Sequence, residues 1–203
     1  STYEICPLTD GQIKEFTRKW LENASKAKIL QKQIFSSPFR DTVMRPLTLA
    51  HLCAIFERYN KIPEKPKSVY KKIITLLLEE WDTERGIERK SKYSNFEVDR
   101  KMEFLSRMAF ELSTRYKTLN FSKKEIEKIY KHIHKEFKLP ESEVHQVVRE
   151  IESHNGIFLQ SGNDMYEFAH KSLQEFLTAE YIHGLDELPS NKDLILLLPN
   201  ELA

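Results

Sequence analysis

One stretch in the second half of the chain passes from a strand pattern to a helix pattern within about 20 residues. It reads Ile157-Phe158-Leu159-Gln160-Ser161-Gly162-Asn163-Asp164-Met165-Tyr166-Glu167-Phe168-Ala169-His170-Lys171-Ser172-Leu173-Gln174-Glu175-Phe176-Leu177. Two short apolar runs flank Ser161-Gly162-Asn163-Asp164, a composition typical of a hairpin turn. After residue 172 the apolar residues recur at helical spacing. The stretch therefore predicts a β-hairpin followed directly by a helix that ends near Gly184.

The sequence before this hairpin supplies three more helices and one very short strand. Apolar spacing predicts a helix over residues 96–115, and residues 119–121 have the pattern of a short strand. Ser122-Lys123-Lys124-Glu125 fits a capping box that begins a second helix, and Pro140 opens a third. Helix, strand, helix, helix and hairpin is the order of a winged helix. We therefore place a winged-helix domain at residues 89–184.

The first half of the chain has the pattern of a helical bundle. Thr9-Asp10-Gly11-Gln12 fits a capping box, Pro46 suits the first position of a strongly apolar helix, and Ser68 is the expected cap of another. A polar stretch over residues 83–95 marks a boundary between subdomains. We place the helical bundle at residues 1–88 and expect residues 185–203 to begin a further helical element. The predicted fold class is mainly α, a helical bundle followed by a winged helix with one small β-hairpin.

Composition limits the possible functions. The chain has 203 residues, 40% of them hydrophobic and 31% charged, and its formal net charge is +1. This charge gives no overall attraction to nucleic acid or membranes, so such binding would need a local patch. The two cysteines suggest no disulfide framework, which fits a reducing cytoplasm. The apolar runs are too short to span a bilayer.

The catalytic motifs of two large enzyme classes are missing from the sequence. It contains no G-x-x-x-x-G-K-[ST] loop to hold phosphates and no G-x-S-x-G nucleophile elbow. Four histidines, His132, His134, His145 and His154, fall within a short span, but their spacing favours solvated surface residues over a metal site. We therefore expect no enzyme activity from the chain by itself and no bound metal.

A winged helix raises the question of DNA binding. The expected recognition helix, residues 141–154, carries four glutamates that would face the phosphates and repel them. These glutamates are Glu141, Glu143, Glu150 and Glu152. The preceding helix carries six lysines interleaved with glutamates, which we interpret as a solvated face with i,i+4 ion pairs. We expect no specific nucleic acid partner and no membrane partner.

Several segments together resemble the NACHT module of the STAND (signal-transducing) ATPases. Phe168-Ala169-His170-Lys171-Ser172-Leu173-Gln174-Glu175-Phe176-Leu177, continued by Ala179, resembles the F-x-H-x-S-x-x-E-[FY]-[LF]-x-A signature that closes this module. Arg45-Pro46-Leu47-Thr48-Leu49-Ala50-His51-Leu52-Cys53 resembles its N-P-L-x-L-x-x-L-C element, with Arg45 in place of the usual asparagine or threonine. Leu77-Leu78-Glu79-Glu80-Trp81 and Ile5-Cys6-Pro7-Leu8-Thr9 resemble two further elements, in the family's order. The resemblance covers residues 3–183.

This resemblance implies a regulatory function. In such proteins a helical domain and a winged helix close with a P-loop domain around ADP, and ATP favours an open form that oligomerises. Carried across, Pro46 would lie against the adenine and His170 would reach the β-phosphate. Residues 1–8 would be the last strand of the nucleotide domain, and the Mg²⁺ and hydrolysis residues would lie outside this chain. The implied partners are the protein's own P-loop domain and further copies of itself, and the implied process is defence signalling, most often in bacteria.

An alternative remains open at this point. The same element order fits a winged-helix transcription regulator with a helical dimerisation domain. The acidic recognition helix and the strand-like residues 3–8 argue against this alternative. A hydrolase of another type has no catalytic constellation to support it.

Overall fold

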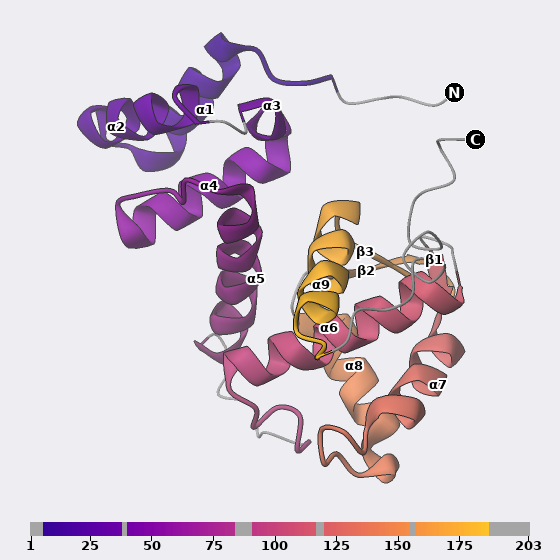
Figure 1. Cartoon of the computed structure of the whole chain (residues 1–203). Helices are drawn as coiled ribbons and strands as arrows, with labels where there is room; N and C mark the ends of the chain where they lie inside the picture. The colour runs from indigo at the N-terminus through magenta and orange to yellow at the C-terminus, as the bar shows by residue number, and fades with distance from the viewer. Residues whose placement is uncertain (1–5, 38–39, 84–90, 117–119, 155–156, 187–203) are drawn as a thin grey trace. The chain divides into compact units, whose positions relative to one another are not determined.

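The structure is a computed structural model that describes residues 6–37, 40–83, 91–116, 120–154 and 157–186. Within these residues the protein is mainly helical with one small antiparallel sheet, which confirms the predicted fold class (Figure 1). By its contacts the chain divides into two units, Ser1–Leu76 and Leu77–Ala203, which we describe one at a time. The boundary predicted at residue 88 lies outside the described residues and stays a prediction.

Two helices, α1 (Asp10–Leu21) and α2 (Ala24–Phe35), begin the first unit. The predicted capping box is confirmed, because the Gln12 N–H donates to Thr9 Oγ1 (3.3 Å) and the Thr9 N–H donates to Gln12 Oε1 (2.9 Å). Glu22 ends α1 in the left-handed conformation (φ 49°), and the Asn23 side chain then caps α2. The two helices pack against each other through buried aliphatic residues: Ile13, Leu21, Ala27, Leu30 and Ile34.

The rest of this unit consists of α3 (Arg40–Val43), α4 (Pro46–Tyr59) and the start of α5 (Pro66–Thr83). Six residues of α4 are buried, as expected for a strongly apolar helix: Thr48, Leu49, Leu52, Cys53, Ile55 and Phe56. Burial raises the pKa of the Cys53 thiol to about 12, which keeps the sulfur protonated and unreactive at neutral pH.

Three details of the first unit differ from the sequence-based expectations. Ser68 does not cap α5, since the helix begins at Pro66, whose fixed φ suits a first turn. Helical spacing groups Trp20 with Ile13 and Leu21 as apolar residues of α1. Trp20 is nevertheless 40% exposed, and its Nε1 donates to Glu57 Oε2 (2.9 Å). Residues 6–9 form no strand, and residues 1–5 of the predicted strand lie outside the described part of the chain.

The second unit has the predicted order of a winged helix. It contains α6 (Val98–Arg115), β1 (Asn120–Ser122), α7 (Lys123–Ile133), the 3₁₀ turn η1 (Glu141–Glu143), α8 (Val144–His154), β2 (Phe158–Gly162), β3 (Met165–Phe168) and α9 (Lys171–His183). The helix expected to start after Pro140 begins with the 3₁₀ turn and becomes α-helical at Val144. The element expected at residues 185–203 falls mostly outside the described residues, which end at residue 186.

The three strands form an antiparallel sheet in the order β1-β3-β2. Phe121 pairs with Tyr166 on one side of β3, and Phe158 pairs with Phe168 on the other. Asp164, in the turn between β2 and β3, adopts the left-handed conformation (φ 56°), which aspartate tolerates. The rings of Phe121, Phe158 and Phe168 pack within 4.5–5.7 Å of one another, centroid to centroid, and hold the sheet together.

Helix α6 lies at the centre of the second unit. It packs against α9 and α7, and α7 packs in turn against α8 (Figure 1). Its buried face includes Phe104, Leu105, Met108, Ala109 and Leu112. The ring of Tyr93, just before α6, is fully buried 5.2 Å from that of Phe104. Because α6 contacts both α7 and α9, its packing fixes the position of α9 and therefore the point at which α9 follows the hairpin.

The capping box at the start of α7 gives a test of the local structure. The Glu125 N–H donates to Ser122 Oγ (3.3 Å) and the Ser122 N–H donates to Glu125 Oε2 (2.6 Å). We expect Ser122→Ala to lower the free energy of unfolding by about 1 kcal/mol, because it leaves an N–H of the first turn without a partner. Denaturant unfolding of the variant measures this loss. Ser142→Ala, at an exposed position, is the control, and an equal loss in both variants would contradict the assignment.

Candidate functional site

His170 lies at the junction between β3 and α9, where it is the N-cap of the helix. Its ring Nδ1 accepts a hydrogen bond from the Ser172 N–H (3.2 Å), and its carbonyl accepts one from the Leu173 N–H (2.9 Å). Because Nδ1 is an acceptor, the neutral ring carries its proton on Nε2. The junction therefore selects one tautomer of the imidazole, with Nε2–H as its donor.

The chain on both sides of His170 is held in place. The Ala169 N–H donates to the Ile157 carbonyl (2.8 Å), which ties the junction to the start of the hairpin. Phe168 is buried in the aromatic cluster of the sheet, and Leu173 is buried in the first turn of α9. The half-buried imidazole is thus carried by a well-anchored strand-to-helix turn.

Packing accounts for several of the other signature residues in α9. Leu173, Phe176 and Leu177 are buried, whereas Glu175 and Ala179 are exposed. Buried Gln174 donates its side-chain N–H to Ser113 Oγ on α6 (3.0 Å), and the Ser113 hydroxyl lies 3.2 Å from that of Thr178. These contacts fix α9 along α6.

Pro46 belongs to the first unit, so its environment is considered separately. It occupies the first position of α4, after Arg45, whose side chain makes no capping hydrogen bond. Pro46 is exposed, and the next residue, Leu47, is 42% exposed, whereas Thr48 and Leu49 are buried. The start of α4 therefore presents a rigid apolar ring on the surface, backed by a packed helix.

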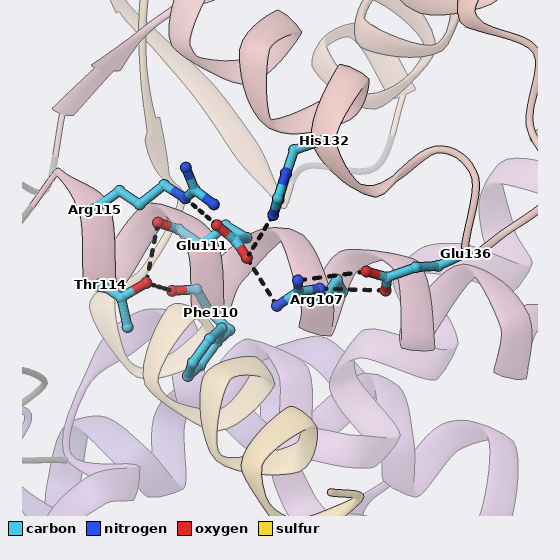
Figure 2. Close-up of polar contacts among 7 residues, drawn as sticks. All are labelled: Arg107, Phe110, Glu111, Thr114, Arg115, His132 and Glu136. Carbon is cyan, nitrogen blue, oxygen red and sulfur yellow. Dashed lines mark hydrogen bonds and ion pairs between the residues drawn. The ribbon is translucent and has the colours of Figure 1, made fainter. Parts of the chain in front are cut away.

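A charged cluster, which the sequence analysis did not single out, joins α6 to α7 and to the segment that follows α7 (Figure 2). We call it the Glu111 cluster; its members are Arg107, Glu111, Arg115, His132 and Glu136. Glu111 is only 4% exposed, and its carboxylate pairs with Arg107 Nη1 at 2.8 Å and with Arg115 Nε. His132 Nε2, on α7, lies 3.8 Å from the same carboxylate. The cluster thus neutralises a carboxylate that the packing of α6 buries.

Arg107 connects this cluster to its surroundings. Its Nε lies 3.3 Å from Glu136 Oε2, beyond the end of α7, and its guanidinium lies 4.8 Å from the centre of the Tyr181 ring on α9. The ring of Tyr181 also lies 4.8 Å from that of Phe110. The sequence signal for this arrangement is the four-residue spacing of Arg107, Glu111 and Arg115 along one helix.

Two of the glutamates expected to face outward from the recognition helix are engaged within the fold, so that expectation is wrong for them. Glu143 Oε2 accepts from the Lys92 N–H (2.7 Å), and Glu150 Oε2 accepts from the Ser91 hydroxyl (2.5 Å). The pKa of the Glu150 carboxyl lies above its usual value, chiefly because the group is buried. The Ser91 hydrogen bond and the charge of buried Lys101 oppose this rise. The remaining two are Glu141, which is exposed, and Glu152, whose side chain lies outside the described residues.

For most lysines of α7, the expected i,i+4 ion pairs are not found among the described residues. Its carboxylates serve other groups: Glu125 caps the helix, and Glu127 Oε1 lies 2.9 Å from His145 Nδ1. Four exposed lysines have no ion-pair partner among the described residues: Lys124, Lys128, Lys131 and Lys135. Their charges face solvent.

The histidines form no ligand set in the described part of the chain. His134 was expected at the surface but is buried, because its Nδ1 hydrogen-bonds to the Leu139 carbonyl (2.7 Å) and its ring stacks on Tyr130. His132 and His145 are exposed, and the side chain of His154 lies outside the described residues. No group of three or more His, Cys, Asp or Glu side chains among the described residues is arranged to hold a metal ion.

The comparisons with known proteins agree with this architecture. Residues 67–182 match the family described as the winged helix-turn-helix domain C-terminal to NACHT, which is more than half of the chain. The chain belongs to this family. Comparison with curated proteins gave no match. The predicted NACHT context is therefore confirmed, and α7 with α8 supplies the helix-turn-helix of the domain while β2 and β3 supply its wing.

The family match also limits what is established. It includes His170 but stops short of Pro46, and it describes a domain associated with an NTPase without assigning a nucleotide contact to this chain. The sequence contains neither a G-x-x-x-x-G-K-[ST] loop nor a G-x-S-x-G motif. No helix among the described residues is both long and apolar enough to cross a membrane.

The Glu111 cluster gives a test of the winged-helix domain. Glu111→Ala leaves Arg107, whose side chain is only 12% exposed, without its partner within α6. Breaking a buried pair costs about 3–5 kcal/mol, so we expect a loss of this size in the free energy of unfolding. Arg115→Ala removes a half-exposed partner of the same carboxylate and should cost less than about 1 kcal/mol. Denaturant unfolding of both variants measures the two losses in unfolding free energy. A larger loss for Arg115→Ala than for Glu111→Ala would contradict this prediction.

Proposed function

We propose that this chain is the regulatory part of a NACHT-type STAND ATPase, in which it closes over bound ADP and gates nucleotide-dependent oligomerisation. The family match supports this proposal, because its description is a winged helix-turn-helix domain C-terminal to NACHT. The P-loop and Mg²⁺ ligands would come from the NACHT domain. The partners are then the protein's own P-loop domain and further copies of the full-length protein. A cytoplasmic signalling role, in bacterial defence, is the setting that the resemblance favours.

The geometry of His170 is the observation that carries this proposal. The Ser172 N–H occupies Nδ1, so Nε2 is the nitrogen that can donate to a phosphate oxygen. The ring also lies at the N-terminus of α9, where the helix dipole favours an anion. Cap and phosphate donor are therefore compatible functions of one side chain, because they use different nitrogens.

Pro46 supports the proposal in a second way. A proline at the first position of a helix has a fixed backbone, and its exposed ring offers a flat apolar surface that suits an adenine base. Because a rigid wall loses little entropy when a ligand binds, such a contact favours a preformed pocket.

A transcription regulator is the second candidate. The observation that favours it is the set of four exposed lysines in α7 and just after it, which have no ion-pair partner among the described residues. Exposed Glu141 weighs against it, because this residue begins the element that would enter the major groove. Nanomolar binding of a preferred DNA sequence would place this candidate above the ATPase role.

We expect the isolated chain to hydrolyse neither ATP nor GTP. Phosphoryl transfer depends on residues that hold Mg²⁺ and phosphates, and the sequence has no P-loop to supply them. A phosphate-release assay on the purified chain measures this. Hydrolysis that persists through a second purification step would contradict the assignment.

A pair of substitutions at His170 in the full-length protein separates the two functions of the ring. His170→Asn keeps an acceptor near the Nδ1 position and caps the helix, but its side chain is too short to replace Nε2. A hydrogen bond to a charged group is worth about 1.5–3 kcal/mol, so we expect His170→Asn to weaken ADP retention by about 10- to 150-fold with little change in melting temperature. ADP release and thermal unfolding measure the two effects.

The matched control is His170→Gln, whose longer side chain places an N–H donor near the Nε2 position. We expect it to retain ADP better than His170→Asn does, and to melt at a lower temperature because the cap is weaker. Normal ADP release from a well-folded His170→Asn protein would show that His170 acts only as a helix cap.

A further inference from the structure

A pocket with a volume of about 590 Å³ lies in the first unit, between the α4–α5 loop and the first turns of α5. We call it the lysine pocket. Its lining includes four lysines and two hydroxyl groups: Lys61, Lys65, Lys71, Lys72, Ser68 and Thr75. It shares no residue with the His170 junction or with the start of α4.

The framework of the pocket is held by contacts on both sides. On the loop side, the Ile62 N–H donates to Gln33 Oε1 of α2 (2.8 Å), and the Ile62 side chain is 4% exposed. On the helix side, Ser68, Lys72 and Thr75 recur at spacings of four and three residues, which places them on one face of α5. The lysines therefore extend from an ordered framework around one hollow.

Positive charge in this pocket is poorly compensated. Glu64 is the single carboxylate of the lining, and it pairs with Lys61 at 3.0 Å between two exposed side chains. The Lys72 ammonium lies 3.7 Å from the centre of the Tyr59 ring, a cation–π contact that leaves its charge uncancelled. Lys65 and Lys71 have no ion-pair partner among the described residues.

Side chains, and not the helix terminus, supply this positive character. Pro66, the first residue of α5, has no N–H, and the N–H groups of Ser68 and Val69 both donate to the Lys65 carbonyl. The side-chain donors of the lining are four ammonium groups, of which Lys61 is paired with Glu64, and two hydroxyls. Both kinds of group bind phosphate oxygens.

We propose that the lysine pocket binds a compact ligand with several phosphate groups. Its volume falls in the range of small-molecule sites, roughly 300–1,000 Å³, and an open hollow of this size has room for a short polyphosphate. A duplex would need an extended basic surface, and an acidic peptide would need apolar anchor pockets beside the charges. Several phosphates are needed because a single monovalent anion would balance only one of the lysines.

Titration calorimetry of the 203-residue chain with inorganic tripolyphosphate tests this site, and the absence of an adenosine group keeps the test separate from the nucleotide role of His170 and Pro46. We expect saturable one-to-one binding, reduced at least tenfold by the double substitution Lys71→Gln/Lys72→Gln. Lys61→Gln/Lys65→Gln, on the loop side, should cause a similar loss and covers the case in which the first variant folds poorly. Glu64→Gln should tighten binding about two- to fivefold, because it removes the carboxylate from the lining.

The control variant is Lys124→Gln/Lys128→Gln, which removes the same charge from exposed, unpaired lysines of α7. It should bind tripolyphosphate within about twofold of the parent chain. The proposal would be overturned by an equal loss of binding in the control and the pocket variants. It would also be overturned if the parent chain bound neither tripolyphosphate nor the vesicles described below.

Phosphate groups reach such a site either as a free polyphosphate or as a lipid headgroup. Co-sedimentation with phosphatidylcholine vesicles that contain phosphatidylinositol bisphosphate distinguishes these sources, with phosphatidylserine vesicles of equal charge as the reference. A lipid headgroup would be assigned if the chain sediments selectively with the phosphatidylinositol bisphosphate vesicles, and if the pocket variants lose this binding while the α7 control keeps it. Binding of tripolyphosphate alone would assign a soluble ligand. Equal binding to both kinds of vesicle would indicate a general surface charge effect and would count against the pocket.

Discussion

The buried carboxylate of Glu111 is the constraint on which the winged-helix domain depends. A charge that is 4% exposed loses most of its hydration, and the loss is offset only if cationic groups stay close. Arg107 and Arg115 supply these groups from the turns before and after Glu111. Arg107 also contacts Glu136, just after α7, and Tyr181 of α9. The residue that neutralises the Glu111 carboxylate therefore also links α6 to these two parts of the domain.

The position of His170 follows from this packing. Helix α9 is fixed along α6 by buried apolar residues and by the hydrogen bonds of Gln174 and Ser113, and the aromatic cluster fixes the end of β3. The junction between these two elements holds His170 with Nδ1 occupied. The cap role uses Nδ1 alone, and so it is compatible with the phosphate contact that we propose for Nε2.

The formal net charge of +1 conceals a strong local separation of charge. The lysine pocket and the exposed face of α7 concentrate ammonium groups. The carboxylates near them balance little of this charge, because Glu64 pairs with Lys61 alone, Glu125 caps α7 and Glu127 contacts His145. In η1 and α8, Glu143 and Glu150 hold the segment at Ser91 and Lys92. Interactions with anionic partners consequently depend on particular surfaces of this protein and not on its overall charge.

Short-range features of this protein were predictable from its sequence. The capping boxes at Thr9 and Ser122, the hairpin and the helix order depend on residues a few positions apart, so their patterns are visible in the chain itself. The buried state of Glu111 and the bond between Ser91 and Glu150, 59 residues apart, depend on how distant helices pack. The tautomer of His170 and the gathering of lysines around one hollow likewise required the tertiary structure, because spacing along a chain does not specify which polar groups lose their water or meet in space.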